Sequence, residues 1–308
     1  MWLDDDERAP FAQEPNGREK TTMKRLSDAC VSIMARGLIS ALLWLPYEKR
    51  VSLAGRMFSS IIAPVAGFNI RVRDNVSLVM PDMPENEVKS LQRGVCDNIG
   101  RTIIEFFSGQ EFIDYVRDTP ITGPGAEVLA KARDARQPVI LVGGHIGNYD
   151  VVRAVLIANG YRVGGLYRPM KNNHFNSYYV SVLSKIGTPL FPQGRRGMID
   201  VVKFVRSGGM IGLLMDQNSR KGATLKFFDH DAPTATTAAD LAVKFNAPLI
   251  PIYSIRRDNG LDFRIIAETA IPHGDRKTMS QAINDNLEKQ VRAHMDQWFW
   301  IHRRWKRK

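Results

Sequence analysis

The amino-acid sequence predicts an α/β protein with a mainly parallel mixed sheet and crossover helices, preceded by a helical N-terminal region. Apolar residues recur at three- and four-residue steps through 85–107, which is typical of an amphipathic helix. After a turn at 122–125, short apolar runs alternate with amphipathic segments, as in β-α units. With 308 residues and 44% hydrophobic residues, the chain can bury a full core.

The pattern divides the chain into three parts. Residues 1–20 are polar and aperiodic, which predicts a disordered acidic tail. Residues 21–120 form the helical region, and residues 121–308 form the α/β domain with a basic, aromatic C-terminus.

Strands are expected in this domain wherever an apolar run is short, and helices where the spacing is amphipathic. The expected strands are 138–142, 162–167, 188–191, 210–215, 249–255 and 262–266, and the expected helices are 149–158, 175–186, 198–205, 236–245 and 278 to about 298.

Two apolar stretches in the helical region, 30–46 and 57–70, are candidates for membrane contact. Arg36 interrupts the first, and serine, proline and glycine interrupt the second, so neither reaches the roughly 18 to 20 residues of a bilayer span. Interfacial helices are expected, helped by Trp44, Lys49 and Arg50. An ordinary buried helix pair is the alternative.

The net charge of +11 can attract nucleic acid, anionic lipid, an acidic protein or a phosphate-bearing substrate. No zinc or helix-turn-helix signature is present, so nucleic acid is disfavoured. Trp298, Trp300 and Trp305 stand among cations near the C-terminus, which suits an anionic membrane surface or a C-terminal helix that packs its tryptophans on the sheet. Cys30 and Cys96 match no metal or redox spacing, so a reducing cytoplasmic setting is expected.

Polar residues follow the expected strands where each one ends. Ligands of open α/β sheets bind beyond the carboxyl ends of the strands, so these residues are the candidates for a functional site. They are His145, Arg168, Arg195, Arg196, Asp216 and Gln217.

The segment GGHIGNYD places Asp150 five residues after His145. On one regular helix the two would lie about 140° apart, so His145 must precede the helix. Gly143, Gly144 and Gly147 allow a tight turn, Asn148 suits the N-cap, and Asp150 then falls in the first helical turn, where it can fold back toward the histidine.

Such a pair suits general-base catalysis, in which imidazole takes a proton from a hydroxyl and the carboxylate fixes its tautomer. No serine or cysteine lies in a G-x-S-x-G context, so a covalent acyl-enzyme is not indicated. In the alternative interpretation, Asp150 only complements the helix dipole and His145 is a structural loop residue.

The remaining candidates are expected to bind substrate. Arg168 directly follows a strand and is suited to hold a phosphate or stabilise an oxyanion. Arg195 and Arg196 are expected to meet lipid phosphates or to form a solvated face. Asp216 and Gln217 either contact substrate or organise the loops around the histidine. The substrate-binding set also includes the N-cap residue Asn148.

GGHIGNYD is followed in order by LYRP, FPQGRR, LLMDQN, APTATTAADLA, APLIPIY and QWFWIHRRWK. Together with RDNVSLVMPDMP and NIGRTIIEFF before them, these blocks resemble the late acyltransferases of bacterial lipid A biosynthesis, the lauroyl and myristoyl acyltransferases. That family lies within the wider lysophospholipid and glycerolipid acyltransferase group. The resemblance covers nearly the whole chain.

The resemblance implies a glycerolipid acyltransferase-like fold with His145 and Asp150 as the catalytic dyad. It implies acyl transfer from acyl carrier protein to a hydroxyl of a lipid A precursor of the Kdo-lipid IVA type, in lipopolysaccharide biosynthesis. It further implies no metal or cofactor beyond the acyl carrier protein co-substrate, and a place on the cytoplasmic face of the inner membrane. FPQGRR resembles the phosphate-contacting FPEG block, although Gln193 replaces its acidic residue. Residues 171–173 also depart from the expected Asp-Asn-Pro.

Two alternatives remain. One is acyl transfer by the same dyad to another lysophospholipid, aminolipid or glycolipid, and the other is a membrane-binding protein without catalysis.

Overall fold

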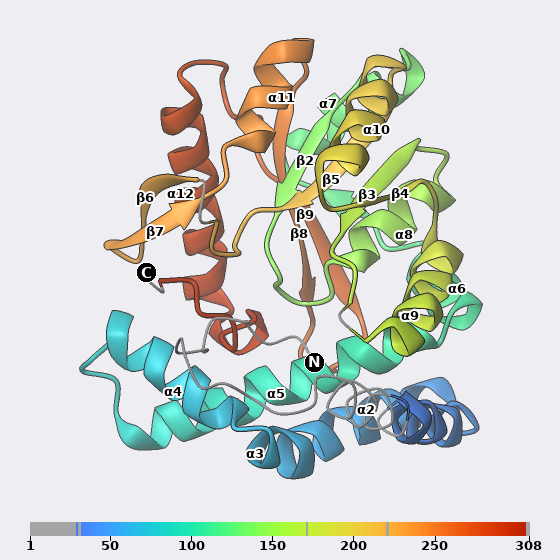
Figure 1. The fold of residues 1–308 in the computed structure, drawn as a ribbon, viewed down its shortest axis with the longest axis vertical. Coiled ribbons are helices and arrows are strands. Elements are labelled where there is room, and N and C mark those ends of the chain that lie inside the picture. The colour runs from blue at the N-terminus through green and yellow to red at the C-terminus, as the bar shows by residue number, and fades with distance from the viewer. Residues whose placement is uncertain (1–28, 30–31, 171, 220–221, 306–308) are drawn as a thin grey trace, which may run out of the picture.

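The computed structural model describes residues 29, 32–170, 172–219 and 222–305 (Figure 1). The predicted acidic tail at 1–20 lies outside these residues, as does Cys30. Within them, a layer of helices from the N-terminal part of the chain lies along one edge of an α/β sheet (Figure 1).

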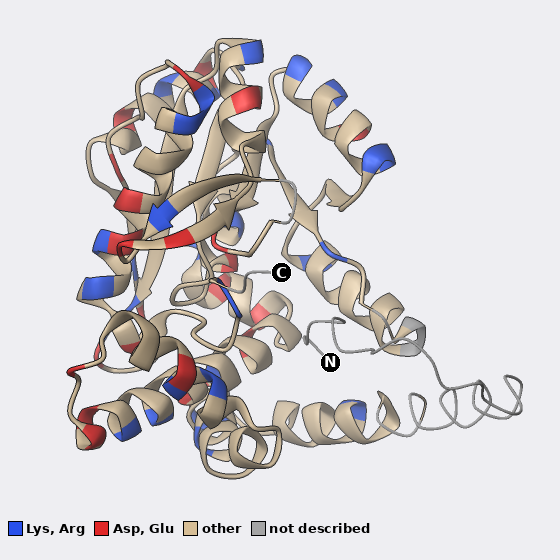
Figure 2. Cartoon of the chain, turned by 60° about the vertical axis from the view of Figure 1, so that its left-hand side comes forward, with Lys and Arg blue, Asp and Glu red and all other residues tan. Residues whose placement is uncertain are grey.

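The helical layer begins with an apolar helix at Ser32–Leu43, whose one charged residue is Arg36 (lower right of Figure 2). The helix predicted over 85–107 is confirmed, because α5 has the same bounds and buries one face. The remaining members of the layer are α2 (Tyr47–Met57), a π-helical turn (Phe58–Ile62), α3 (Ala63–Val65), α4 (Phe68–Val79), α5 (Glu85–Phe107) and α6 (Gln110–Val116).

The large sheet has seven strands in the order β1-β9-β8-β2-β5-β3-β4. β2 pairs in parallel with β5 and β8, and β3 pairs in parallel with β4 and β5, whereas β9 is antiparallel to β8. The bounds are β1 Ile121–Thr122, β2 Ile140–Gly143, β3 Val163–Tyr167, β4 Leu190–Pro192, β5 Met210–Leu214, β8 Leu249–Arg256 and β9 Phe263–Ala267. The predicted mainly parallel mixed sheet with crossover helices is therefore confirmed.

Helices cover both faces of this sheet, and all of them connect strands except α12, which follows the last strand (Figure 1). They are α7 (Gly125–Asp134), α8 (Asp150–Ala158), α9 (Asn173–Ile186), α10 (Arg195–Arg206), α11 (Thr237–Phe245) and α12 (Arg276–Ala293). All six predicted strands are present, each with bounds within two residues of those expected.

In the α/β part of the chain, β1, α7 and a two-stranded hairpin were not predicted, and the last predicted helix is too long. The hairpin of β6 (Ala223–Phe227) and β7 (His230–Thr234) was not expected, because Pro233 and charged residues interrupt any strand pattern. A contact with the C-terminal segment stabilises the hairpin, because the Trp305 indole donates a hydrogen bond to the Phe227 carbonyl. The predicted final helix also runs too far, since α12 ends at Ala293 and a short 3-10 turn precedes an extended Trp298.

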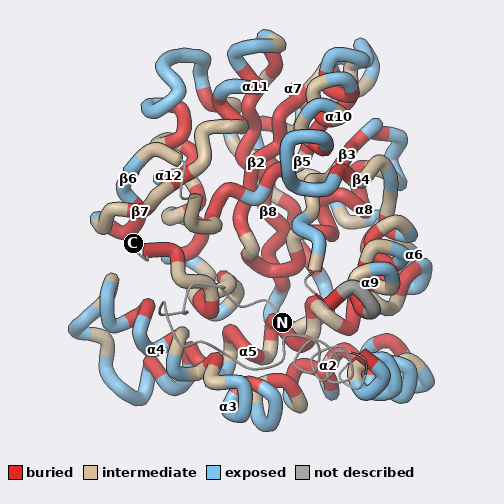
Figure 3. Tube along the Cα trace, viewed as in Figure 1, coloured by how far each residue is buried: buried red, intermediate tan, exposed pale blue. Residues whose placement is uncertain are grey.

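The core lies within and around the sheet, and β8 is buried along its whole length (Figure 3). The three C-terminal tryptophans belong to it: Trp298, Trp300 and Trp305 are 1%, 0% and 7% exposed. The alternative that the tryptophans pack in the interior is confirmed, although they follow α12 and do not lie on a helix as predicted. They do not form an interfacial surface.

Large apolar side chains are instead exposed on the helical layer, where Trp44 is 91% and Val65 88% exposed. Lys49 is exposed, but the expected interfacial role of Arg50 is wrong. Its guanidinium turns inward to Glu111 and Ser108, leaving the side chain 3% exposed. No single described helix is long and apolar enough to cross a membrane, whereas one pair bent by 85°, Tyr47–Val65 with Phe68–Val79, passes on length and composition.

Candidate active site

The loop after β2 makes the tight turn that the glycines predict. Gly147 has a φ of 58°, and a Cβ there would lie 1.9 Å from the Ser254 carbonyl oxygen. Only glycine fits that position. The N-cap of α8 is Tyr149, so the prediction that Asn148 caps the helix is wrong. Asn148 stands one residue earlier, where its Oδ1 accepts a hydrogen bond from the Asp150 N–H at 3.1 Å. His145 thus precedes the helix, as its spacing from Asp150 requires.

His145 is held by Asp216 through two hydrogen bonds. Its Nδ1 lies 2.8 Å from Asp216 Oδ1, and its backbone N–H donates to Oδ2 at 2.7 Å. The Trp298 indole donates to the same Oδ2 at 2.9 Å. Because an ionised carboxylate only accepts, the proton of the neutral imidazole lies on Nδ1, and Nε2 is the basic nitrogen.

Asp216 is itself 3% exposed. Burial alone would raise its pKa, but the charge and hydrogen bonds of His145, together with the Trp298 indole, hold the pKa of this carboxyl well below its usual range. The group is therefore an anion at neutral pH, as a partner for an imidazolium must be.

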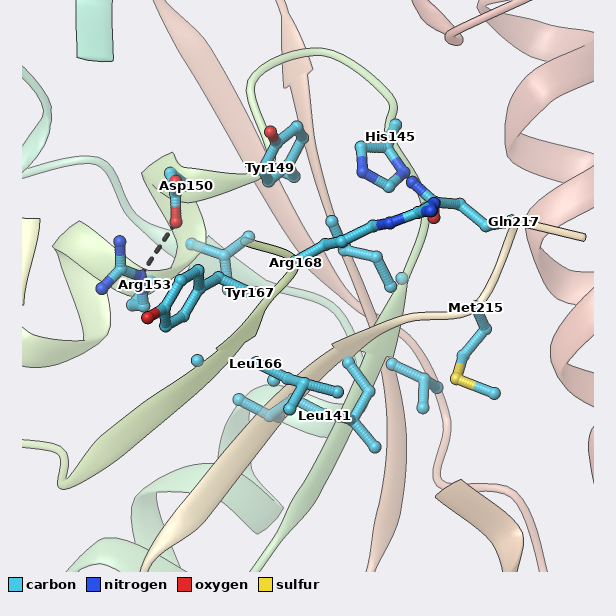
Figure 4. A pocket seen from close by; sticks show the side chains of 18 of the residues that line it. Leu141, His145, Tyr149, Asp150, Arg153, Leu166, Tyr167, Arg168, Met215 and Gln217 are labelled. Atoms are coloured by element: carbon cyan, nitrogen blue, oxygen red, sulfur yellow. Dashed lines mark hydrogen bonds and ion pairs between the residues drawn. The ribbon is translucent and has the colours of Figure 1, made fainter. Parts of the chain in front are cut away.

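Asp150 has a different partner. Its Oδ1 accepts from Arg153 Nε at 2.9 Å, and Arg153 also donates to the carbonyls of Gly187 and Leu183. Figure 4 shows Asp150 turned toward Arg153, with Tyr149 between it and His145. The expectation that Asp150 fixes the His145 tautomer is corrected, because Asp216 makes that contact.

Helix α5, in the N-terminal layer, supports the loop that carries His145. Glu105 is fully buried, and its Oε2 accepts from the Asn148 amide at 2.8 Å. Arg256 pairs with both carboxylate oxygens of Glu105, at 2.5 and 2.8 Å. Asn98 and Thr102 both donate to the Gly147 carbonyl.

Sequence reasoning missed this support, although a signal was present. Asn98, Thr102 and Glu105 recur at four- and three-residue steps, which places three polar side chains on one face of α5. Asn148 belongs to the same network. It is fully buried and does not line the cavity, so its expected substrate contact is corrected to a structural role.

The C-terminal segment holds the loop from the other side. The Phe299 N–H donates to the His145 carbonyl at 2.9 Å, and the Gly147 N–H donates to the Gln297 carbonyl at 3.0 Å. Ile146 and Trp298 form an isolated antiparallel bridge. The segment that follows α12 thereby becomes part of the site.

A cavity of about 390 Å³ opens beside His145 (Figure 4). His145, Asp150, Arg168 and Gln217 are among the residues that line it, whereas Arg195 and Arg196 are exposed and lie outside the lining. Much of its lining is apolar and includes the side chains of Leu141, Val163, Leu166, Leu183, Leu190 and Met215. Among the described residues, no group of three or more histidine, cysteine, aspartate or glutamate side chains is placed to hold a metal ion.

A half-buried histidine that is held by a buried carboxylate beside a largely apolar cavity is suited to an enzyme that moves a fatty acyl group. Comparison with known proteins gives the same class. The family model of bacterial lipid A biosynthesis acyltransferases matches residues 18–307, and the chain belongs to this family of acyltransferases.

Its curated relatives are distant. Lipid A biosynthesis acyltransferase 2 of Shigella flexneri is 23% identical over 248 residues, 75% of each chain. A lipid A biosynthesis acyltransferase of Haemophilus influenzae is 23% identical over 241 residues, 76% of each chain. Phosphatidylinositol mannoside acyltransferase of Mycobacterium tuberculosis is 22% identical over 185 residues, which are 59% of this chain and 58% of that protein.

Proposed function

We propose that this protein transfers a fatty acyl chain from acyl carrier protein to a hydroxyl of a lipid A precursor of the Kdo-lipid IVA type, with His145 as general base. The observation that carries the proposal is the hydrogen bond from Nδ1 to the buried Asp216, because it makes Nε2 the atom that accepts the proton. The family membership supports the acyl-transfer chemistry and the lipid A pathway.

In the proposed reaction, Nε2 of His145 takes the proton of the acceptor hydroxyl as its oxygen attacks the thioester carbonyl carbon. The C–S bond then breaks, and the imidazolium returns the proton to the leaving thiolate. Asp216 stabilises the imidazolium between these steps. Arg168, at the polar mouth of the cavity, is proposed to stabilise the oxyanion or hold an acceptor phosphate, and Gln217 to contact the substrate beside it. No metal or further cofactor takes part.

The apolar part of the cavity is proposed to take the acyl chain during transfer. Burial of each CH₂ group from water contributes about 0.8 kcal/mol, so an apolar channel beside His145 would favour a long acyl donor. The mouth and the loops around it would hold the polar acceptor.

We further propose that the helical layer sits on the cytoplasmic face of the inner membrane. Trp44 and Val65 are almost fully exposed there. Four further apolar side chains of the layer are more than half exposed: Ile33, Met34, Ile61 and Ile70. The loop that carries His145 is bonded to α5 of the same layer, which would place the reacting atoms close to a lipid acceptor.

The test is an assay with an acyl carrier protein thioester and a tetra-acylated, sugar-bearing lipid A precursor. His145→Ala is expected to lower the rate by about 10³-fold, within the range for loss of a general base. His230→Ala, in the hairpin, is the matched control and should retain wild-type activity. Full activity in His145→Ala would show that this histidine is not the base.

The mannoside acyltransferase among the relatives favours a second candidate acceptor, another glycolipid. The same assay with phosphatidylinositol mannoside and with lysophosphatidic acid separates the acceptors. Transfer to either one, with none to the lipid A precursor, would overturn the acceptor assignment and leave the chemistry intact.

A further inference from the structure

Helix α10 carries a basic face beside the cavity. Its sequence, RRGMIDVVKFVR, contains four cations and one anion. Arg195, Arg196, Lys203 and Arg206 are all exposed. At about 100° per residue they fall within an arc of about 100° of the helix surface. The opposite face is apolar, and Val201 and Val205 on it are fully buried.

An isoleucine lies at the centre of this basic face. Ile199 is 48% exposed and falls within the same arc as the four cations. Among the described residues, Lys203 is the one cation of the four that forms an ion pair, with Asp200 at 3.7 Å. In the part of the chain that the structure describes, neither Arg195, Arg196 nor Arg206 forms an ion pair. The face is thus basic, largely unneutralised and centred on an apolar side chain.

The position of α10 connects this face to the reaction. Met198 lies on the same helix and lines the cavity, as does Gln193 two residues before the helix begins. A partner bound along α10 would therefore stand next to the cavity that opens beside His145.

The basic face also lies far from the exposed apolar helices. In Figure 1, α10 is at the upper right, whereas α2, α3 and α4 lie along the bottom. In Figure 2, blue ribbon segments that mark lysine and arginine recur along the helix at the upper right, which is α10. If the apolar layer rests on a membrane, α10 faces the aqueous side. That geometry favours a soluble acidic protein over a lipid surface as its occupant.

We propose that the α10 face, defined as Arg195, Arg196, Ile199, Lys203 and Arg206, is the docking surface for the acyl carrier protein, which presents acidic side chains to it. This inference rests on the proposed function, since it names where the acyl donor binds. The four cations attract the acidic side chains of the carrier protein, and Ile199 contacts an apolar side chain that lies among them. The arm that carries the thioester passes Met198 to enter the cavity.

The test uses Lys203→Glu combined with Arg206→Glu, at the end of α10 away from Gln193. Lys277→Glu with Lys289→Glu, two exposed lysines of α12, is the control with an equal change of charge. Activity is measured with an acyl carrier protein thioester and with an acyl-pantetheine of the same chain length. Binding of the carrier protein alone is measured by fluorescence anisotropy, and binding to vesicles of phosphatidylethanolamine and phosphatidylglycerol by sedimentation.

The α10 variant is expected to raise KM for the carrier-protein thioester about tenfold at low salt, with kcat nearly unchanged. The KM for acyl-pantetheine and the binding to vesicles should not change, and the α12 control should match wild type. Unchanged affinity for the carrier, or a loss of vesicle binding instead, would overturn the inference. A further outcome separates the two proposals. If the wild-type protein transfers no acyl group but binds the carrier protein, and the α10 variant binds it more weakly, the docking surface is supported and the proposed function is rejected.

Discussion

Two buried aspartates near His145 differ in the partner that each one holds. Asp216 accepts from His145 and Trp298, whereas Asp150 accepts from Arg153. The sequence motif predicts that Asp150 is the partner of His145, but in the structure His145 is hydrogen-bonded to Asp216. The difference teaches that spacing along the chain can locate a site without identifying which of its groups touch.

Strand register explains the geometry. β2 and β5 are parallel neighbours with Gly143 opposite Leu214. His145 and Asp216 each follow two residues later, so the two side chains leave the sheet together. Asp150 enters α8 instead, where a side chain three residues along, Arg153, is on the same face.

The largest effect is expected for Asp216→Asn. Asparagine keeps the size of the side chain but can present a donor to Nδ1, which favours the wrong imidazole tautomer and cannot balance an imidazolium. We expect kcat to fall by up to about 10³-fold, as much as for loss of His145 itself, because Asp216 acts through that histidine. Steady-state kinetics, with circular dichroism to verify folding, measure this. A fall of less than tenfold in a folded variant would make the contact structural.

Asp150→Asn is expected to act mainly on stability. It leaves the Arg153 guanidinium buried without a charged partner, which costs about 3 kcal/mol of the free energy of unfolding. We expect a loss of activity of about tenfold to a hundredfold, less than for Asp216→Asn. Urea unfolding and kinetics on the same samples measure both effects.

The control is Asp150→Asn combined with Arg153→Met, which removes both charges and should recover most of the lost stability. An activity loss as large as that of Asp216→Asn, with stability unchanged, would contradict this comparison. It would restore Asp150 to the direct catalytic role that the motif predicts.

Local patterns were sufficient for six of the seven strands of the large sheet and for the position of His145. The alternation of apolar runs gave all six predicted strands, and the glycines around His145 gave the turn. The parallel order also brought His145, Arg168 and Gln217 to one cavity, because the carboxyl ends of neighbouring strands share an edge.

Contacts between distant segments were beyond those patterns. Glu105 and Arg256 are 151 residues apart, and Trp298 is 82 residues from Asp216. No local periodicity encodes such pairs. For the same reason the sequence left open whether the C-terminal tryptophans face a membrane surface. Their spacing does not show that they pack against Phe227 and Phe228 of the β6–β7 hairpin.

Trp298→Phe tests how far the indole supports Asp216. It removes one hydrogen bond to a buried carboxylate, a contact that contributes about 1.5 to 3 kcal/mol. We expect kcat to fall roughly tenfold with KM nearly unchanged. Trp300→Phe is the matched control, because this indole is equally buried but donates to the Met295 carbonyl. Equal kinetic losses in both variants would mean that general packing of the cluster is responsible.

The smallest effect concerns the pH dependence of stability. Folding lowers the pKa of Asp216, so the folded protein holds this proton less tightly than the unfolded chain, where the value is about 3.9. The ionised carboxylate therefore stabilises the fold above about pH 4, and that contribution is lost as the pH falls toward the folded-state pKa. The gap in unfolding free energy between wild type and Asp216→Asn should shrink between pH 6 and pH 3 in urea titrations. A gap that stays constant over that range would mean that the contact with His145 does not favour the ionised carboxyl, and the tautomer argument for Asp216 would fail with it.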